Sequence, residues 1–396
     1  MKTILNLILI LSSAFLSFKQ ADSQPVYNKI VFSRQESQDD WDLWLMDLEG
    51  NNQTRILNSP YNDSDPHFRS DGAKILFTRL INGIPPVQDI FLVNPDGTGL
   101  VNLTLDITEE VSRPKWSWTG NQVVFCKTVG INDKDIYTMN ADGSNKRAMV
   151  TGINNDEWPA FSPDGQKITF QRYIGSASNQ KSKICLYNIS QGTTTDLTDG
   201  SNLDEMPTFS PDGKYLLFKR GTTTPDIYRL KIGDGTVENL TYNSDFDEAP
   251  TYSYDGTKIA WMQSISGISS AEIWTMNIDG SEKKQLTSNS VADFNPSFSP
   301  TSQAGFSTTA YPERLFNIFQ YGQDGLVCNY QCITSKTLTL EIYDVMGNMV
   351  VGRDVETYAG ENQFFIRQIP LKKGIYVGIL FDHRGCLGGS KFIFRN

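Results

Sequence analysis

The sequence predicts an all-β protein: a six-bladed β-propeller followed by a small antiparallel β-sandwich domain. Three observations lead to this prediction. A segment with a proline, an aromatic residue and a Ser-Pro-Asp-Gly turn recurs every 43 to 48 residues. Each repeat has room for four short strands, which is the content of one propeller blade. Beyond residue 300 the repeat stops, and a different alternation of apolar and polar residues takes over.

The clearest copy of the repeat runs from Asp156 to Phe170. Its proline is followed two residues later by an aromatic residue, and then by a turn in which glycine supplies a positive φ angle. A β-branched or aromatic run follows, then an Asp-Ile-aromatic strand, a second Asp-Gly turn, and a strand that ends in Leu-Thr. The six repeat prolines are Pro66, Pro114, Pro159, Pro207, Pro250 and Pro296.

The two ends of the repeat region complement each other. The segment from Ile30 to Leu57 has the pattern of a blade without its first strand, and Asn295 to Pro300 is a first strand without the rest. Joined, they make one blade and close the ring, since an open ring would leave strand edges unpaired. Five complete blades and this shared one give the six blades predicted for residues 25–300.

The repeat resembles the TolB-type β-propeller repeat, which also occurs in the propeller caps of prolyl-oligopeptidase-like peptidases. The resemblance rests on the Pro-x-Phe strand and the Ser-Pro-Asp-Gly turn, as in residues 159–165, and covers roughly residues 27–300. Because TolB-type propellers bind protein partners at the channel face, the resemblance implies a rigid platform for a protein or peptide ligand.

The N-terminal segment, residues 1–24, is predicted to be a signal peptide. Lys2 gives it a positive start, and the apolar run from Ile4 to Phe18 is too short for a membrane span. No other stretch is long and apolar enough to cross a membrane, so the mature chain is predicted to lack a transmembrane segment. We therefore expect a secreted or cell-surface protein, with the periplasm as the alternative.

The chain changes character after the propeller. Residues 301–313 are small and polar, and are predicted to be a linker. Residues 314–396 alternate in the manner of a small antiparallel β-sandwich, with strands expected at 338–344, 349–351, 363–366, 374–381 and 391–394.

Residues 314–396 resemble the C-terminal sorting domain of type IX secretion substrates. The matching motifs are Ile342-Tyr343-Asp344-x-x-Gly347, Leu371-x-x-Gly374-Ile375-Tyr376 and Lys391-Phe392-Ile393. The resemblance implies the type IX secretion machinery as a partner and passage through the outer membrane of a Bacteroidetes-type cell. An ordinary β-sandwich binding module is the alternative.

Charge and cysteine content limit the function classes. The formal net charge of −10 argues against nucleic acid and anionic membrane surfaces as partners. Five cysteines leave at least one free thiol unless one pairs between molecules. Cys126 and Cys185 are predicted to be buried thiols, while either Cys328 or Cys332 could pair with Cys386.

An enzyme of the peptidase type is disfavoured. The chain has no Gly-x-Ser-x-Gly elbow, and the segment after the propeller is too short and too rich in strands for a hydrolase domain. Its two histidines, His67 and His383, fall in different domains and are predicted to be surface or turn residues, with His67 at the channel mouth as a lesser alternative. The chain is therefore predicted to be a non-enzymatic binding protein. A secreted hydrolase or lyase with a carboxylate or calcium site in the channel is the alternative.

Acidic residues gather ahead of the repeat prolines. The third residue before each proline is Asp63, Val111, Asp156, Asp204, Asp247 and Asp293 in turn. Because this segment leads into the innermost strand, the six copies are expected to surround one end of the channel. Two interpretations remain: a carboxylate funnel for a cation or a basic peptide, or acceptors of backbone N–H groups in the turns between blades. The structural interpretation is favoured for the Asp residues, which recur with the period of the fold.

Other residues at this end break the sixfold pattern. A Glu follows the Asp in three consecutive blades only, and Arg113, Trp158 and Met206 immediately precede their prolines. Calcium is a candidate ligand near Glu157, Glu205 and Glu248, since it accepts several oxygen ligands with flexible geometry. The candidate ligand-binding residues of the channel mouth are Arg113, Asp156, Glu157, Trp158, Asp204, Glu205, Met206, Asp247 and Glu248.

Overall fold

The computed structural model describes residues 25–37, 40–81, 87–131, 133–175, 181–265 and 270–301, together with the strands between 316 and 394. The chain divides into two compact units, Met1–Gly305 and Phe306–Asn396. The described residues form strands and turns without an α-helix, which confirms the all-β prediction. Accordingly, none of them belongs to a helix with the length and hydropathy needed to span a bilayer.

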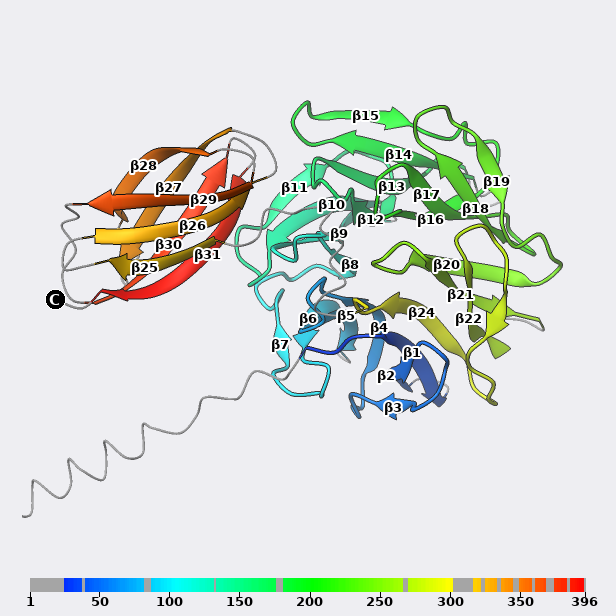
Figure 1. Ribbon diagram of the computed structural model, residues 1–396. Helices are drawn as coiled ribbons and strands as arrows, with labels where there is room; N and C mark the ends of the chain where they lie inside the picture. The colour runs from blue at the N-terminus through cyan, green and yellow to red at the C-terminus, as the bar shows by residue number, and fades with distance from the viewer. Residues whose placement is uncertain are drawn as a thin grey trace, which may run out of the picture. The chain divides into compact units, whose positions relative to one another are not determined.

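The described part of the first unit forms six four-stranded antiparallel sheets arranged as blades around a central channel (Figure 1). This arrangement confirms the six-bladed propeller. Blade 1 consists of β24 (Asp293–Phe298), β1 (Lys29–Ser37), β2 (Asp40–Asp47) and β3 (Thr54–Arg55). Blade 2 consists of β4 (Asn62–Phe68), β5 (Ile75–Ile81), β6 (Val87–Val93) and β7 (Val101–Asn102). Blade 3 consists of β8 (Val111–Trp116), β9 (Gln122–Gly130), β10 (Asp133–Asn140) and β11 (Arg147–Val150).

The remaining blades follow in the same order, with the first strand innermost. Blade 4 consists of β12 (Asp156–Phe161), β13 (Lys167–Tyr173), β14 (Ser182–Asn188) and β15 (Thr193–Asp196). Blade 5 consists of β16 (Asp204–Phe209), β17 (Tyr215–Arg220), β18 (Asp226–Lys231) and β19 (Val237–Asn239). Blade 6 consists of β20 (Phe246–Tyr252), β21 (Lys258–Ser264), β22 (Glu272–Asn277) and β23 (Lys284–Gln285).

Blade 1 joins the two ends of the ring. β24 pairs antiparallel with β1, with Ile30 opposite Phe298 and Arg34 opposite Asp293. The closure predicted from the sequence is therefore confirmed. The inner edge of β1 has its partner in the last strand of the propeller, so the ring is closed by main-chain pairing.

The Ser-Pro-Asp-Gly turn is held by its own side chains. The Ser162 hydroxyl donates to the Asp164 carboxylate at 2.6 Å and accepts from the Lys167 N–H at 2.9 Å. Gly165 adopts a φ of 68°, a conformation that favours glycine. The same serine contacts recur at Ser210 and Ser253, which explains why this motif marks the repeat.

The Leu-Thr ending of the fourth strand is tied to the Asp-Ile motif of the third. In blade 2 the Thr104 hydroxyl accepts from the Ile90 N–H at 3.0 Å and donates to the Asp89 carboxylate at 2.9 Å. Thr241 repeats these contacts with Ile227 and Asp226 in blade 5. The two motifs are therefore halves of one hydrogen-bonded unit that fixes the outer edge of a blade.

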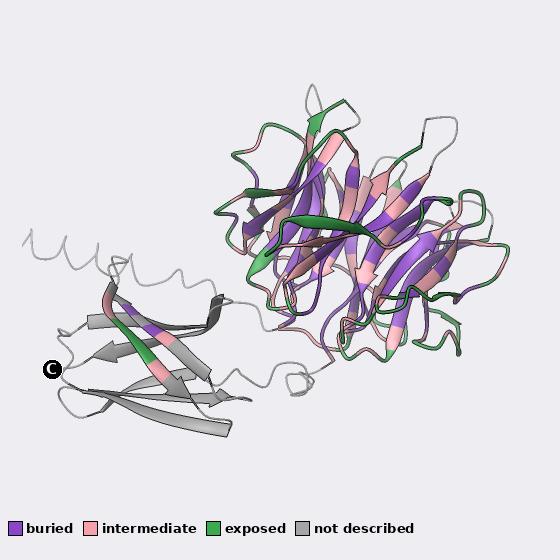
Figure 2. Cartoon of the chain, turned by 90° about the horizontal axis from the view of Figure 1, so that it is seen from above, coloured by how far each residue is buried: buried purple, intermediate pink, exposed green. Residues whose placement is uncertain are grey.

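The hydrophobic core lies between neighbouring blades. One cluster, for example, joins Val124 and Ile136 of blade 3 to Phe161 and Phe170 of blade 4. Figure 2 shows burial along the inner strands and exposure at outer strands and loops. Burying an aromatic side chain of this size stabilises a fold by about 1.5–3 kcal/mol. The buried aromatic residues that follow the repeat prolines are Phe68, Trp116, Phe161, Phe209, Tyr252 and Phe298.

Cys126 and Cys185 are free and buried, as predicted. Burial raises the pKa of both thiols, and the charge of Glu157 adds to the rise at Cys126. They are therefore thiols in the packed interior. The side chains of the other three cysteines lie outside the described residues, so their pairing stays a prediction.

The second unit consists of strands in the described part of residues 316–394. β25 (Phe316–Tyr321), β26 (Gly325–Cys332) and β29 (Gly360–Arg367) form one antiparallel sheet. β28 (Met349–Thr357), β27 (Lys336–Asp344), β30 (Gly374–Asp382) and β31 (Gly385–Phe394) form another. The five expected segments all fall in strands, β27 to β31. The packing of the two sheets into a sandwich, and their sorting role, stay predictions. Residues 1–24, 302–315 and His383 lie outside the described residues.

Candidate binding channel

Each innermost strand is interrupted at its proline. The cross-strand register shifts there in all six blades, as between Glu157 and Ala160 or between Glu205 and Thr208. Proline has no N–H to donate to a neighbouring strand, and a bulge accommodates it. The residue before each proline has a left-handed backbone, with φ between 50° and 58°. Such backbone costs on the order of 1 kcal/mol per residue and often marks functional positions.

The bulge turns the repeat Asp away from the channel. In blade 4 Asp156 lies opposite Arg172 and accepts two hydrogen bonds from its guanidinium, both at 2.7 Å. The same pairing occurs in three other blades. The pairs are Asp63 with Arg79, Asp204 with Arg220, and Asp293 with Arg34.

These pairs correct one prediction. Asp156, Asp204 and Asp247 are at most 1% exposed, so they are not ligand contacts at the channel mouth. The Asp residues are structural hydrogen-bond acceptors, as the favoured interpretation proposed, but their main donor differs. They accept mainly from an arginine of the second strand rather than from backbone N–H groups. The arginine stacks over aromatic rings, as Arg220 does over Phe218 and Tyr228 at 5.1 Å.

Blades 3 and 6 lack the Asp–Arg pair and have other contacts in its place. In blade 3 Val111 lies opposite Lys127, whose ammonium pairs instead with Glu109, two residues before Val111, at 2.8 Å. In blade 6 Asp247 accepts a hydrogen bond from the indole N–H of Trp261 at 3.0 Å. Burial without a cationic partner raises the pKa of Asp247 to about 6.

The residues before the prolines form a ring around the channel, which we call the pre-proline ring. They are Asp65, Arg113, Trp158, Met206, Ala249 and Asn295, and they line one space together with four of the repeat prolines. The Arg113 guanidinium donates to Asp65 at 2.7 Å and lies 4.2 Å from the centroid of the Trp158 ring. The predicted contacts Arg113, Trp158 and Met206 are thus brought together.

The three glutamates gather on one arc, which we call the acidic arc. Lys219 Nζ lies 2.7 Å from a carboxylate oxygen of Glu205 and 3.3 Å from one of Glu248. The Tyr173 hydroxyl donates to Glu205 at 2.6 Å. Burial alone would lower the pKa of Lys219, but the two carboxylates raise it. Burial raises the pKa of Glu248 despite Lys219.

The acidic arc does not point freely into solvent. The side chains of Glu205 and Glu248 are 9% and 14% exposed, at the boundaries between blades 4, 5 and 6. Glu157 is half-buried and accepts a hydrogen bond from the Asn155 amide at 3.1 Å. The arc acts on the channel mouth through its charge, because it holds three carboxylates and one ammonium, which contacts Glu205 and Glu248.

The arc offers calcium an incomplete set of ligands. Among the described residues, no three His, Cys, Asp or Glu side chains gather closely enough to hold a metal ion. The Lys219 ammonium lies between Glu205 and Glu248, where the sequence predicted a cation. Calcium would have to displace it, so calcium binding stays a prediction.

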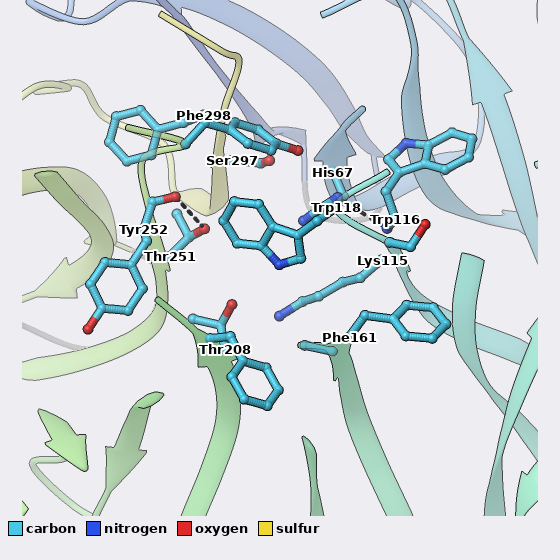
Figure 3. Close-up of a pocket in the computed structure, with 14 residues that line it drawn as sticks. His67, Lys115, Trp116, Trp118, Phe161, Thr208, Thr251, Tyr252, Ser297 and Phe298 are labelled. Carbon is cyan, nitrogen blue, oxygen red and sulfur yellow. Dashed lines mark hydrogen bonds between the residues drawn. The ribbon is translucent and has the colours of Figure 1, made fainter. Parts of the chain in front are cut away.

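A second ring follows the prolines, and we call it the post-proline ring. Its members are His67, Lys115, Ala160, Thr208, Thr251 and Ser297, and they line a further space toward the Ser-Pro-Asp-Gly turns (Figure 3). The histidine was predicted at the surface or in a turn, with the channel mouth as the lesser alternative, and it is this alternative that the structure supports. His67 lies in β4 and accepts a hydrogen bond from the Trp116 N–H on Nδ1, at 3.3 Å. Lys115 was not singled out by sequence reasoning.

A profile of the TolB beta propeller domain matches residues 18–178 and 159–315 of the chain. The chain belongs to the TolB β-propeller family. The matched ranges include all six blades and both rings that line the channel. Among curated proteins, none is similar enough to count as a relative of this TolB-family chain.

Solved structures share the TolB-family fold at low identity. The putative TolB of Agrobacterium tumefaciens has 18% identity and a TM-score of 0.56, over 68% of this chain and 93% of its own. TolB of Acinetobacter baumannii has 18% identity and a TM-score of 0.51, over 87% of each chain. Hydrazine synthase of Kuenenia stuttgartiensis has 12% identity and a TM-score of 0.58, over 92% of this chain and 67% of its own. At these identities the likeness shows the fold alone.

Proposed function

We propose that this chain is an exported, non-enzymatic binding protein whose channel mouth receives a basic segment of a protein or peptide partner. One observation carries the proposal. The pre-proline ring presents six different side chains around one opening, beside an acidic arc of three carboxylates and one ammonium. A TolB-type propeller is compatible with a rigid binding platform.

The ring and the arc supply different parts of recognition. Trp158, Met206 and Ala249 offer apolar surface, and the strained backbone holds it without further ordering on binding. The acidic arc has a net charge of −2, because one ammonium offsets one of three carboxylates. Partly buried charges are screened less by salt than exposed ones, so this field favours a lysine or arginine at the mouth.

Calorimetry with a tetralysine peptide tests whether the channel mouth binds a basic segment. In a variant with Glu157→Gln, Glu205→Gln and Glu248→Gln, the dissociation constant should rise about tenfold or more at low salt, because each lost charge pair contributes roughly 0.5 kcal/mol or more. The matched control carries Glu49→Gln, Glu238→Gln and Glu282→Gln, which make the same charge change at exposed outer positions. The control should stay within about twofold of the parent.

Titrations of the same proteins with tetralysine and with calcium distinguish the binding function from the alternative enzymatic function. Equal heats in the parent, mouth variant and control variant would contradict the basic-partner proposal. Calcium heat that is present in the parent and absent in the mouth variant would favour the alternative, a hydrolase or lyase with a calcium site. Circular dichroism of each variant checks that the propeller is intact.

We also propose that residues 314–396 direct export through the type IX secretion machinery. The proposal rests on the motifs around Ile342 and Gly374, which fall in β27 and β30. A chain that ends at residue 313 should remain in the periplasm of the native host. Cell fractionation with an antibody against the propeller measures this, with the full chain as the control. Normal amounts of the shortened chain at the surface or in the medium would contradict it.

A further inference from the structure

Lys115 differs from the other charged residues of the channel because its ammonium has no partner among the described residues. It lines both the space at the pre-proline ring and the space at the post-proline ring, as do His67 and Thr251. Figure 3 shows its side chain reaching from its strand toward the centre of the channel, where Trp118 and Thr208 also point. In the described part of the chain, the Lys115 ammonium has neither a hydrogen bond nor an ion pair.

The other cations near the channel have partners. Arg113 is bound to Asp65 and stacked on Trp158, and Lys219 is held by two glutamates. Asp65 also favours the charged form of Lys115, but its two oxygens already accept from Arg113 and Asn295, each at 2.7 Å. A charge enclosed in this way is costly until it meets a partner of opposite sign.

His67 adds a second donor. Because its Nδ1 accepts from the Trp116 N–H, Nε2 carries the proton of the neutral ring. Burial, with a contribution from Lys115, lowers the pKa of His67 to about 3, so the ring stays neutral at physiological pH. Burial also lowers the pKa of Lys115 to about 8, which leaves it mostly protonated at pH 7.

Aromatic side chains close the channel beyond Lys115. Trp118 and Tyr254 take the place of the proline in the Ser-Pro-Asp-Gly turns of blades 3 and 6. Their rings meet edge to face at 5.4 Å, and the Tyr254 hydroxyl donates to the Phe68 carbonyl at 2.7 Å. The space between these side chains is large enough for a carboxylate group.

We propose that Lys115 and His67 form a carboxylate-binding site inside the channel. The ligand is a carboxylate at the end of a slender molecule: a free short carboxylic acid, or the C-terminus of a peptide. This inference goes beyond the proposed basic partner. Lys115 follows its proline while the glutamates precede theirs. At the corresponding positions of blade 4, Glu157 and Ala160 lie opposite Gln171 and Thr169, so the two sites lie about 7 Å apart along the strand direction.

Calorimetry with acetate, triglycine and triglycine amide tests the site. The parent should bind acetate or triglycine, and Lys115→Met should lower that affinity about tenfold or more. The control, Lys214→Met, removes a side chain that is 73% exposed and should change the affinity less than about twofold. Triglycine amide should not bind. Tighter binding of triglycine than of acetate identifies a peptide end as the source, and the reverse order identifies a free acid.

A measurement on the parent covers the case in which Lys115→Met does not fold. Lysine acetylation by acetic anhydride at pH 8, read by mass spectrometry, should modify Lys115 readily because its pKa is lowered. Saturating triglycine or acetate should protect Lys115 and leave Lys214 unchanged. Equal affinity of the parent and Lys115→Met overturns the proposal, as does unprotected Lys115 or a parent that binds neither probe up to about 50 mM.

Discussion

An Asp63→Asn variant should unfold with a free energy about 3 to 5 kcal/mol lower than that of the parent, because it leaves a buried guanidinium without its carboxylate. Asp63 accepts hydrogen bonds from Arg79 at 2.6 and 2.7 Å, and the two side chains are 0% and 6% exposed. Burial raises the pKa of Asp63 despite Arg79. Guanidinium chloride unfolding, followed by tryptophan fluorescence, measures the loss.

Two controls separate the lost pair from a general effect of the substitution. Asp106→Asn breaks a pair with Lys146 in which the carboxylate is 70% exposed, and should cost less than about 1 kcal/mol. Asp63→Leu combined with Arg79→Met should recover most of the stability, since apolar pairs often replace buried ion pairs without loss. A loss for Asp63→Asn no larger than that for Asp106→Asn would refute the structural role of the pair.

Deletion of residues 291–300 should abolish the folded monomer. The deletion removes β24, so the inner edge of β1 loses its pairing from Ile30 to Arg34. Arg34 also loses the carboxylate of Asp293, which it contacts at 2.7 Å. An unpaired apolar edge recruits other chains, so aggregation is expected. Light scattering after size exclusion and a thermal unfolding scan measure the outcome.

A second deletion controls for the shortening of the chain. Removal of residues 302–311, within the predicted linker, takes away the same number of residues and should leave the propeller monomeric and as heat-stable as the parent. A monomer of parental stability from the 291–300 deletion would show that ring closure does not depend on β24.

The fold could be predicted because its determinants are local and repeated. A proline, an aromatic residue and a Ser-x-Asp-Gly turn recur in register. Ser162 hydrogen-bonds within its own turn, and Gly165 has the positive φ of 68° that the turn needs. The closure between Ile30 and Phe298 followed from two incomplete patterns that matched. Two strands of the second unit, β25 and β26, were missed because their polar residues obscure the alternation.

The site was predicted less well because the bulge reverses the faces of the innermost strand. Strict alternation places Asp156, Trp158 and Ala160 on one face. With the register shift, Asp156 shares its face with Phe161, since their partners Arg172 and Ile168 lie four residues apart. A signal was available in the sequence. Arg79, Arg172 and Arg220 each stand 16 residues after their Asp, whereas Val111 is followed at that distance by Lys127.

The left-handed residue before each repeat proline determines how this channel can change. The same backbone conformation is occupied by Asp, Arg, Trp, Met, Ala and Asn, so the side chain is not what holds the strand there. The six side chains at the opening can therefore vary while the backbone stays constant, as hypervariable loops vary on an antibody sandwich. In a propeller with the same bulge, the residues that line the channel opening can be predicted from the sequence, because they are the ones that precede the repeat prolines.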